Sequence, residues 1–372
     1  MNGKDAMHSF PNNYDLAVIG GGPAGTAAAI TAARLGAKVV LLEAGEFPRQ
    51  KVCGEFVSAE SLDVLRDLLR AVAEGEFTLR AAPIIDHARL FLAGRRVETP
   101  IEPPALSIPR YELDRLLWQA AQRDGVRALD GCEVREIDGN SPFCLNTAKG
   151  EIEATSVIVA AGRWSRFRPS IVLPPGPKWI GVKAHFREQQ PRRSTDLYFF
   201  DHGYCGVQPV ADDVVNACAM VRPDRAKTLD EVFALHSDLA QRSRRWQTVT
   251  EPVTTAPLIY RTPEPVRGNL VFVGDAAAFI DPFVGDGISI ALRTGCLAAG
   301  ELVSAIKRST SLADAVAHYQ AKYDMQFVPL IRAASRIRTL LSCPKPLLAA
   351  SLPLLRIPGV LSYMIRKTRH AR

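Results

Sequence analysis

The sequence predicts an α/β protein in which a Rossmann-type domain is split by an inserted antiparallel-sheet domain and followed by a helical C-terminal tail. Three patterns lead to this prediction. Residues 14–43 run strand, helix, strand; residues 179–221 contain four short strand-like runs; and the chain after Gly268 returns to strand, loop and long helix. Hydrophobic residues make up 47% and charged residues 23% of the 372 residues, which excludes the disordered, collagenous and coiled-coil classes.

The first domain starts with an apolar run at residues 14–20 that ends in glycines. An Ala-rich segment follows at 23–35, with no helix breaker after its first turn, and a second apolar run follows at 38–43. The two runs are therefore expected to be buried parallel strands joined by a helix. Further helices are expected at 59–74 and 111–124, and further strands at 133–137 and 151–160.

The inserted sheet is expected from four runs that turn residues separate, at 179–186, 195–200, 203–210 and 214–221. A helix at about 228–243 and a strand at 253–260 follow. The predicted division of the chain is a cofactor-binding domain at 14–75, 100–172 and 264–310, a substrate domain at 76–99 and 173–263, and a basic helical segment at 311–372 that prolines interrupt.

The net charge of +7 is concentrated in the tail. Residues 325–372 carry nine Lys and Arg and no acidic residue, so the preceding part of the chain has a net charge of about −2. This distribution does not favour a nucleic-acid partner. The tail suits docking on an anionic membrane surface or an apolar partner, and the alternative is a helical lid packed on the domain.

The cysteines and the first residues bear on location. The seven cysteines include no CxxC pair, which favours reduced thiols. Residues 1–14 lack the apolar core of a secretory signal, and no uncharged run is long enough to span a membrane. A cytoplasmic protein is expected, with peripheral membrane contact through the tail as one option. The histidines lack metal-ligand spacing, so no metal is expected.

A glycine motif follows the first strand. Gly20, Gly22 and Gly25 match G-x-G-x-x-G, with Pro23 and Ala24 inside it, and this motif suits a dinucleotide whose pyrophosphate lies at the start of the helix. Glu43 ends the second strand, where it can accept hydrogen bonds from ribose hydroxyls. Because a carboxylate repels a 2′-phosphate, FAD or NAD is favoured over NADP.

A second segment, residues 274–288, favours FAD. Asp275 stands at a strand end and can hold ribityl or phosphate-side hydroxyls. A loop containing Pro282 and Gly285 then leads into a helix whose first amides, at Gly287 and Ile288, stabilise negative charge. Reduced flavin develops negative charge at N1 and the C2 carbonyl, whereas a nicotinamide enzyme has no use for this arrangement.

These segments, together with the helix that Arg110 begins and the strand-turn VIVAAGRWSRFR, resemble the FAD-dependent oxidoreductases of the p-hydroxybenzoate hydroxylase and geranylgeranyl reductase superfamily. The resemblance extends from Tyr14 to about Ile306 and implies a split FAD domain, a sheet that covers the flavin and a hydrophobic substrate buried between them. It further implies FAD contacts from Arg49, Arg110, Val134 and Gly162.

Two departures from that superfamily bear on the reaction. Ala161 precedes Gly162, where many hydroxylases have the Asp-Gly pair associated with NAD(P)H use, so NAD(P)H is kept as a reductant without special support. Residues 203–209 lack the Trp found over the flavin in geranylgeranyl reductases. The segment KVCGEF at 51–56 resembles instead a loop of bacterial secondary-metabolite enzymes.

Cys53 and Tyr204 are the candidate catalytic side chains. Either could donate a proton beside the flavin, and the alternative is a small buried thiol and a structural tyrosine. The resemblance favours a monooxygenase, a hydroxylase or epoxidase that acts through a flavin C4a-hydroperoxide on a hydrophobic aromatic, polyketide or isoprenoid-like substrate. The alternatives are a C=C reductase of the geranylgeranyl reductase type and a flavin-binding electron-transfer protein.

Overall fold

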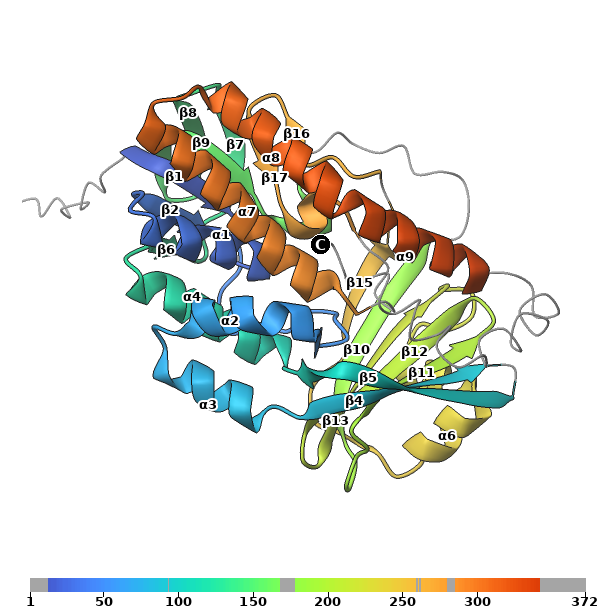
Figure 1. Cartoon of the computed structure of the whole chain (residues 1–372). Coiled ribbons are helices and arrows are strands. Elements are labelled where there is room, and N and C mark those ends of the chain that lie inside the picture. Colours follow the sequence, from blue (N-terminus) through green and yellow to red (C-terminus); the bar gives the residue numbers. More distant parts are fainter. Residues whose placement is uncertain are drawn as a thin grey trace, which may run out of the picture.

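The computed structural model of the protein describes residues 13–341, apart from residues 93, 168–177, 259, 261 and 280–284. The described chain forms two β-sheets, each with its own helices, as Figure 1 shows. One is a largely parallel sheet built from residues 13–159 and 266–272, and the other is a mixed sheet built from residues 56–107 and 179–258. We call them the parallel-sheet unit and the mixed-sheet unit.

The parallel-sheet unit contains the predicted strand–helix–strand element. Its central strands run in the order β16-β17-β9-β1-β2-β6, and the β7–β8 hairpin is joined to β9. β1 pairs in parallel with β2 and β9, so the Rossmann-type prediction is confirmed. The strands are β1 (Asn13–Ile19), β2 (Val39–Leu42), β6 (Arg127–Leu129), β7 (Val134–Gly139), β8 (Phe143–Thr147), β9 (Gly150–Val159), β16 (Val266–Arg267) and β17 (Leu270–Phe272).

The helices of this unit pack against one another at short range. α1 (Pro23–Arg34) contacts α4 (Arg110–Arg123) and α7 (Gly287–Arg308), and α7 also contacts α8 (Leu312–Gln326). Gly295 allows the approach of α7 to α1, because a Cβ there would lie 2.2 Å from the carbonyl oxygen of Ala24. The remaining helical elements are η1 (Ala59–Ser61), α2 (Leu62–Leu69), α3 (Ala73–Ala81), η2 (Gly162–Trp164), η3 (Gly274–Ala276) and α9 (Val328–Leu341).

The mixed-sheet unit contains the four predicted strands in antiparallel pairing. Its order is β14-β10-β13-β12-β11-β4-β5-β3, with β15 also paired to β10, and β11 pairs with β4 in parallel. The strands are β3 (Phe56–Val57), β4 (Ile84–Leu92), β5 (Arg95–Ser107), β10 (Trp179–Arg187), β11 (Ser194–Phe200), β12 (Gly203–Ala211), β13 (Val214–Val221), β14 (Gln247–Thr248) and β15 (Val253–Leu258).

Alternation along β10 separates its two faces. Val182, Ala184 and Phe186 pack in a core with α5 (Leu229–Ala234) and α6 (Ser237–Ser243). Where the sequence predicted one helix at 228–243, the structure has these two short helices. A capping box begins the first, in which the Thr228 side chain accepts from the Glu231 amide and the Glu231 side chain accepts from the Thr228 amide.

The expected boundary at residue 99 falls inside a strand. β5 continues to Ser107 and pairs with β4 over most of its length, so residues 100–107 belong to the mixed sheet. Prolines at 100, 103 and 104 concealed this strand. Two features accommodate them. Pro103 and Pro104 lie where the register with β4 shifts, and β3 pairs with β5 only at Leu106 and Ser107. At the other boundary, α3 extends to Ala81, inside the segment 76–99 that was assigned to the substrate domain.

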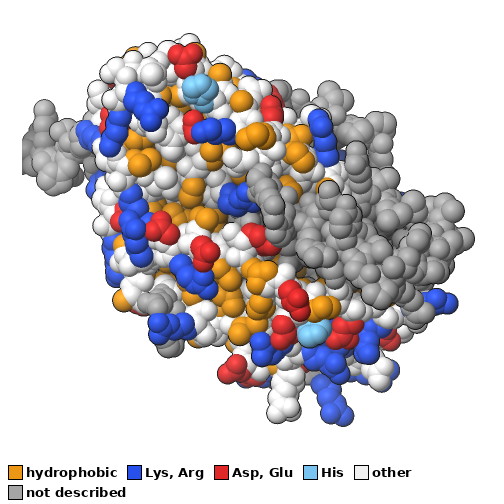
Figure 2. All heavy atoms as spheres, viewed as in Figure 1, with side chains coloured by type: hydrophobic (Ala, Val, Ile, Leu, Met, Phe, Trp, Pro, Cys, Tyr) orange, Lys and Arg blue, Asp and Glu red, His pale blue; other side chains and the backbone are white. Residues whose placement is uncertain are grey.

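The described part of the predicted C-terminal segment packs on the parallel-sheet unit. Tyr319 and Tyr323 of α8 are fully buried, as is Phe327, and the Tyr319 hydroxyl donates to the Phe272 carbonyl at 2.7 Å. Residues 342–372, which include most of the basic tail and its proposed membrane contact, lie outside the described residues. Figure 2 shows basic and acidic side chains interspersed on one face of the molecule.

Among the described helices, α7 is long and apolar enough to cross a membrane by length and composition. However, 61% of its apolar window is buried inside the fold, where it packs on α1 and α8. Cys53, Cys132, Cys144, Cys205, Cys218 and Cys296 are free thiols, as the sequence predicts.

The α1–α7 contact can be tested with two substitutions in one helix. Gly295→Ala places a Cβ against the backbone of Ala24 and should lower the free energy of unfolding by about 1–3 kcal/mol. Gly300→Ala, where a Cβ would meet nothing within 4 Å, should raise it by about 0.5–1 kcal/mol through helix propensity. Urea unfolding of both variants measures the difference, and equal effects would contradict the packing.

Candidate functional site

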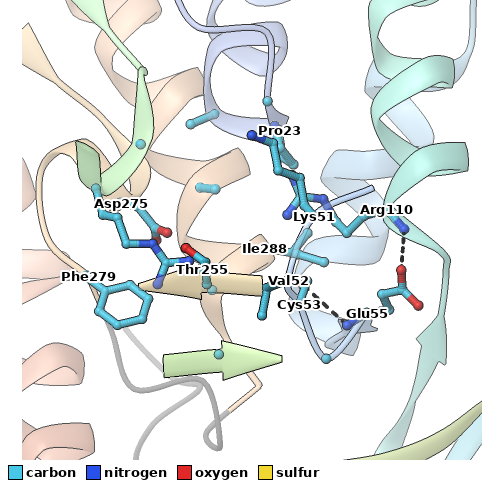
Figure 3. Close-up of a pocket in the computed structure, with 18 of the residues that line it drawn as sticks. Pro23, Lys51, Val52, Cys53, Glu55, Arg110, Thr255, Asp275, Phe279 and Ile288 are labelled. Carbon is cyan, nitrogen blue, oxygen red and sulfur yellow. Dashed lines mark hydrogen bonds between the residues drawn. The ribbon is translucent and has the colours of Figure 1, made fainter. Parts of the chain in front are cut away.

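A cavity of about 840 Å³ lies where the two units meet. The parallel-sheet unit contributes the β1–α1 loop, the loop after β2, the turn after β9 and the start of α7, and the mixed-sheet unit contributes residues of β4, β5, β10 to β13 and β15. In Figure 3, Pro23 lies at the start of α1, with Arg110 and Glu55 on one side of the view and Asp275 and Phe279 on the opposite side. Cavities between two such units are the common place for cofactors.

The three motif glycines do different work. Gly20 has φ +111° and a Cβ there would lie 2.4 Å from the Ala160 oxygen, while a Cβ at Gly25 would lie 1.8 Å from the Gly20 oxygen. These two glycines are thus required by packing, and Gly25 does not line the cavity. Gly22 does line it, and a Cβ there would approach no protein atom closer than Arg110 at 4.0 Å. The protein therefore tolerates a side chain at Gly22 but leaves that space to the cavity.

The start of α1 attracts negative charge. Gly22 is its N-cap residue, Pro23 is its first residue, no side chain caps its amides and its first turn has no acidic residue. Pro23 and Ala24 line the cavity. Uncapped amides and the positive end of the helix dipole together favour an anion at this point.

Glu43 lies directly after β2 and is buried. Its carboxylate accepts from the Gly21 amide at 2.7 Å and the Gly45 amide at 2.9 Å, and it forms a two-pronged ion pair with the Arg49 guanidinium. Burial raises the pKa of Glu43, but the bonds from Arg49 outweigh it and hold the pKa below its ordinary value. The predicted ribose acceptor is therefore ionised and already engaged by the predicted FAD contact Arg49.

Arg110 begins α4 and lines the cavity beside Gly22. Its guanidinium pairs with Asp114, with both N–O distances at 2.8 Å. Burial lowers the pKa of Arg110, but Asp114 outweighs it and the pKa lies above its ordinary value. Lys51 from the loop after β2 also lines the cavity, and burial together with the charge of Arg49 lowers its pKa.

The far side of the cavity is formed by the turn after β9 and by η3. Gly162 has φ +71°, and Arg163 stacks over the Phe279 ring at 4.4 Å. Burial raises the pKa of Asp275, while the charges of Arg163 and Arg110 oppose it. Val134, at the start of β7, lines the same cavity.

The start of α7 completes this wall. Gly285, with φ +79°, Gly287 and Ile288 line the cavity, and a Cβ at Gly287 would meet nothing within 4 Å. Asp286 is the N-cap residue, its side chain makes no capping hydrogen bond, and the first turn has no acidic residue. Pro282 lies outside the described residues.

The two candidate catalytic side chains lie on different elements of the same cavity. Cys53 is half-buried in the loop after β2, and its Sγ accepts from the Glu55 amide at 3.3 Å. Tyr204 is buried on β12, packed against Phe199. Both therefore line the cavity, and a catalytic role for either stays a prediction.

The sequence did not predict a cluster of three buried charged or titratable side chains, Glu55, Lys183 and His185. Lys183 and His185 on β10 contact Glu55, and all three side chains are almost fully buried. In the sequence, Lys183 and His185 alternate with the apolar residues at 182, 184 and 186, and this pattern is typical of a strand with one face toward solvent. The loop at 49–56 covers this face, which is why the charges are buried. Glu55 itself has φ +64°, a left-handed conformation unusual for a residue other than glycine.

With this geometry established, comparisons identify the fold family. A family model described as an FAD binding domain matches residues 13–322. The chain belongs to this family. It is an FAD-dependent oxidoreductase, as the sequence resemblance implied.

Relatives of this FAD family member include enzymes of two reaction types. It is 28% identical over 327 residues to menaquinone reductase of Mycolicibacterium smegmatis, covering 78% of this chain and 76% of that protein. It is 23% identical over 353 residues to tryptophan 2-halogenase of Chondromyces crocatus, covering 86% and 66%. The structure of the flavin-dependent brominase Bmp2 matches with a TM-score of 0.79 at 20% identity, covering 96% of this chain and 93% of that one.

The cavity fits FAD. The open spaces at Gly22 and Gly287 would admit a ligand where a side chain would otherwise lie. Among the described residues, Arg49 Nε and Arg163 Nη1 are buried without a hydrogen-bond partner, and both arginines line the cavity. Buried donors of this kind, with two uncapped helix starts, suit a pyrophosphate and a reduced flavin, both anionic. No group of three or more His, Cys, Asp or Glu among the described residues could hold a metal ion.

Substitutions at Gly22 test the placement of the pyrophosphate. Gly22→Ala should leave the FAD-free protein as stable as the parent, because its Cβ meets no close protein atom, yet weaken FAD binding. Gly22→Asp adds a carboxylate beside the phosphates and should abolish FAD retention. The flavin-to-protein absorbance ratio and fluorescence titration with FAD measure the effect. Stoichiometric FAD in Gly22→Asp would refute this placement.

Proposed function

We propose that this FAD-dependent oxidoreductase is a monooxygenase that transfers one oxygen atom of O₂ to a neutral hydrophobic substrate of aromatic, polyketide or isoprenoid-like type. One observation carries the proposal. Every described residue that the mixed sheet contributes to the cavity is uncharged: Phe56, Ala88, Leu90, Ile101, Gly181, Thr195, Leu197, Tyr204, Gly206, Gln208, Cys218, Ala219, Met220, Val253, Thr254, Thr255 and Leu258.

The charged described residues that line the cavity lie outside the strands of the mixed sheet. None of them lies on the mixed-sheet strands: they are Glu43, Arg49, Lys51, Glu55, Arg110, Glu133, Arg163, Arg166 and Asp275, from the loops and helix starts that follow the strands of the parallel sheet. A charged substrate against the mixed sheet would lose its hydration without gaining a partner, so this wall favours a neutral one. Tyr204 offers an aromatic face, and Gln208, whose amide donates to Ser107 at 2.7 Å, offers a fixed polar group for orientation.

An uncharged wall also suits oxygen transfer. Bound FAD supplies the two-electron chemistry and the activation of O₂, and the protein's part is to exclude water and orient the substrate. Arg49, Arg110 and Arg163 would hold the cofactor, while the mixed sheet would position the substrate. Halogenation of an organic substrate is an oxidation, so the halogenase relatives support oxidative chemistry in this fold. NAD(P)H is the proposed reductant. Ala161 stands where many hydroxylases have an Asp associated with NAD(P)H use, and this argues against efficient direct reduction by NAD(P)H.

A C=C reductase is the second candidate. Cys53 and Tyr204 line one cavity, and either would serve as the acid that alkene reduction requires. The similarity to menaquinone reductase supports this candidate. In that reaction the substrate would again lie on the uncharged wall.

Rapid mixing separates the two reactions. The FAD-loaded protein is reduced without oxygen and without NAD(P)H, then mixed with O₂ in the presence of hydrophobic phenols or polyprenyl compounds. Monooxygenation predicts a transient absorbance distinct from oxidised and reduced flavin, and one ¹⁸O atom from ¹⁸O₂ in the product. Reoxidation without a transient, together with anaerobic flavin oxidation by an alkene, would move the assignment to the reductase.

Two variants refine that outcome. If alkene reduction is the reaction, removal of its proton donor in Cys53→Ala or Tyr204→Phe should slow anaerobic flavin oxidation by roughly 10²–10⁴-fold. Cys205→Ala is the matched control, because this buried thiol lies on the opposite face of β12, in the core against α5 and α6, and burial raises its pKa to about 12. A loss equal to that of the control would remove both residues from the proton-donor role.

A further inference from the structure

A second, smaller cavity lies behind the loop that carries Cys53. This side pocket, of about 350 Å³, is lined by residues of the loop after β2, of α4 and of the mixed sheet: Pro48, Arg49, Gln50, Pro109, Tyr111, His185, Val210, Ala211, Val214, Val249 and Thr250. Tyr111 and Val249 at its border are 37% and 45% exposed, so the side pocket is open to solvent. Arg49 and Gln50 line both cavities, so this loop is the partition between them.

Glu55 connects the two cavities through hydrogen bonds. Its Oε2 lies 2.7 Å from His185 Nε2, and its Oε1 accepts from Lys183 Nζ at 2.5 Å and from the Arg110 amide at 2.8 Å. Glu55 lines the cavity that fits FAD, whereas His185 lines the side pocket. Lys183 also donates to Gln50 Oε1 at 2.9 Å, which ties the partition to β10.

The cluster is electrically balanced. The carboxylate and the ammonium ion cancel, and the side chains of Glu55, Lys183 and His185 are only 0%, 1% and 3% exposed. Burial raises the pKa of Glu55, but its bonds to His185 and Lys183 outweigh it and hold the pKa low. The other titratable or charged groups near the cluster are Arg110 and Tyr111 on α4, Cys218 on β13, and Arg49 and Cys53 on the loop.

We propose that His185 and Glu55 form a proton pathway between the side pocket and the flavin cavity. A proton from water in the side pocket binds His185 Nδ1, the Nε2 proton passes to Glu55 Oε2, and Glu55 releases one proton to water or a reacting group in the flavin cavity. One proton enters as one leaves, and a flip of the imidazole ring restores its Nε2–H. Both residues would relay protons without contacting the reacting atoms themselves, so we class them as positioning residues.

Reoxidation of the flavin consumes a proton from solvent, which such a route would deliver. Conversion of O₂ to H₂O₂ by anionic reduced flavin takes two electrons and one proton from the flavin and one further proton from solvent. The mixed-sheet wall supplies no charged group to carry that proton. Any two-electron flavin reaction exchanges protons with solvent, so the inference goes beyond the proposed function and applies equally to alkene reduction.

A substrate-free experiment on the FAD-loaded protein tests the pathway. The reduced protein is mixed with O₂ from about pH 5 to pH 8, the range in which imidazoles titrate, in H₂O and in D₂O. We expect His185→Gln and Glu55→Gln to slow flavin reoxidation by roughly 10²-fold. In both variants the reoxidation rate should no longer depend on pH or show a solvent isotope effect. The matched control is His236→Gln, because His236 packs against Phe91 and Tyr198 away from both cavities and should keep all three properties.

Chemical rescue separates proton transfer from a purely structural role. In His185→Ala the side pocket gains the space of an imidazole ring, so added imidazole should restore the rate with saturation, and substituted imidazoles should restore it according to their basicity. Nitrogen-15 NMR of histidine-labelled protein gives a readout independent of turnover. It should show His185 as the Nε2–H tautomer in the parent and a changed tautomer population in Glu55→Gln.

The pathway would be overturned if His185→Gln kept the parent pH profile and isotope effect, or if the basicity of added imidazoles had no influence. The FAD absorbance spectrum and the thermal unfolding of each variant exclude misfolding as the cause of a loss. Failure of oxygen transfer to any substrate would refute the proposed function but leave these readouts unchanged, so the two failures are distinguishable.

Discussion

The site depends on a backbone contact too close for any side chain. Because a Cβ at Gly25 would lie 1.8 Å from the Gly20 carbonyl oxygen, the start of α1 is held directly against the end of β1. Parallel pairing of β1 with β2 and β9 brings Glu43 and Gly162 to the same edge, and β17 brings Asp275 there as well. Glu43 then fixes the glycine loop by accepting from the Gly21 amide. The cavity exists because these strand ends coincide.

The sequence predicted most of this edge, since each signal there is local. Two motifs predict this edge without reference to distant parts of the chain. They are the glycine turn between a strand and a helix, and the acidic residue at the end of the next strand. The sequence could not predict the Glu55–Lys183–His185 cluster, which depends on a distant loop covering β10. The continuation of β5 past residue 99 was missed for a related reason, because its prolines are accommodated by a register shift against β4 and by the short pairing with β3.

The two walls divide the work between them. The parallel-sheet wall is charged, and its arginines and helix starts suit a phosphate-bearing cofactor. The strands of the mixed sheet contribute only uncharged residues, and they face the part of the cavity that the cofactor would leave free. A reaction that the cofactor performs needs little from the second wall beyond shape and dryness. Relatives of this chain include a menaquinone reductase and a tryptophan 2-halogenase, and the structure of a flavin-dependent brominase has the same fold.

The split of the parallel sheet along the chain affects how the protein is synthesised. β1 leaves the ribosome first, but its neighbour β9 ends at Val159, and β17 follows only at Leu270. During translation β1 therefore waits with an unpaired edge, and the start of α7 at Gly287 arrives later still. FAD meets a complete binding site only after the start of α7 at Gly287 has emerged, so the cofactor can stabilise the fold only late in its formation.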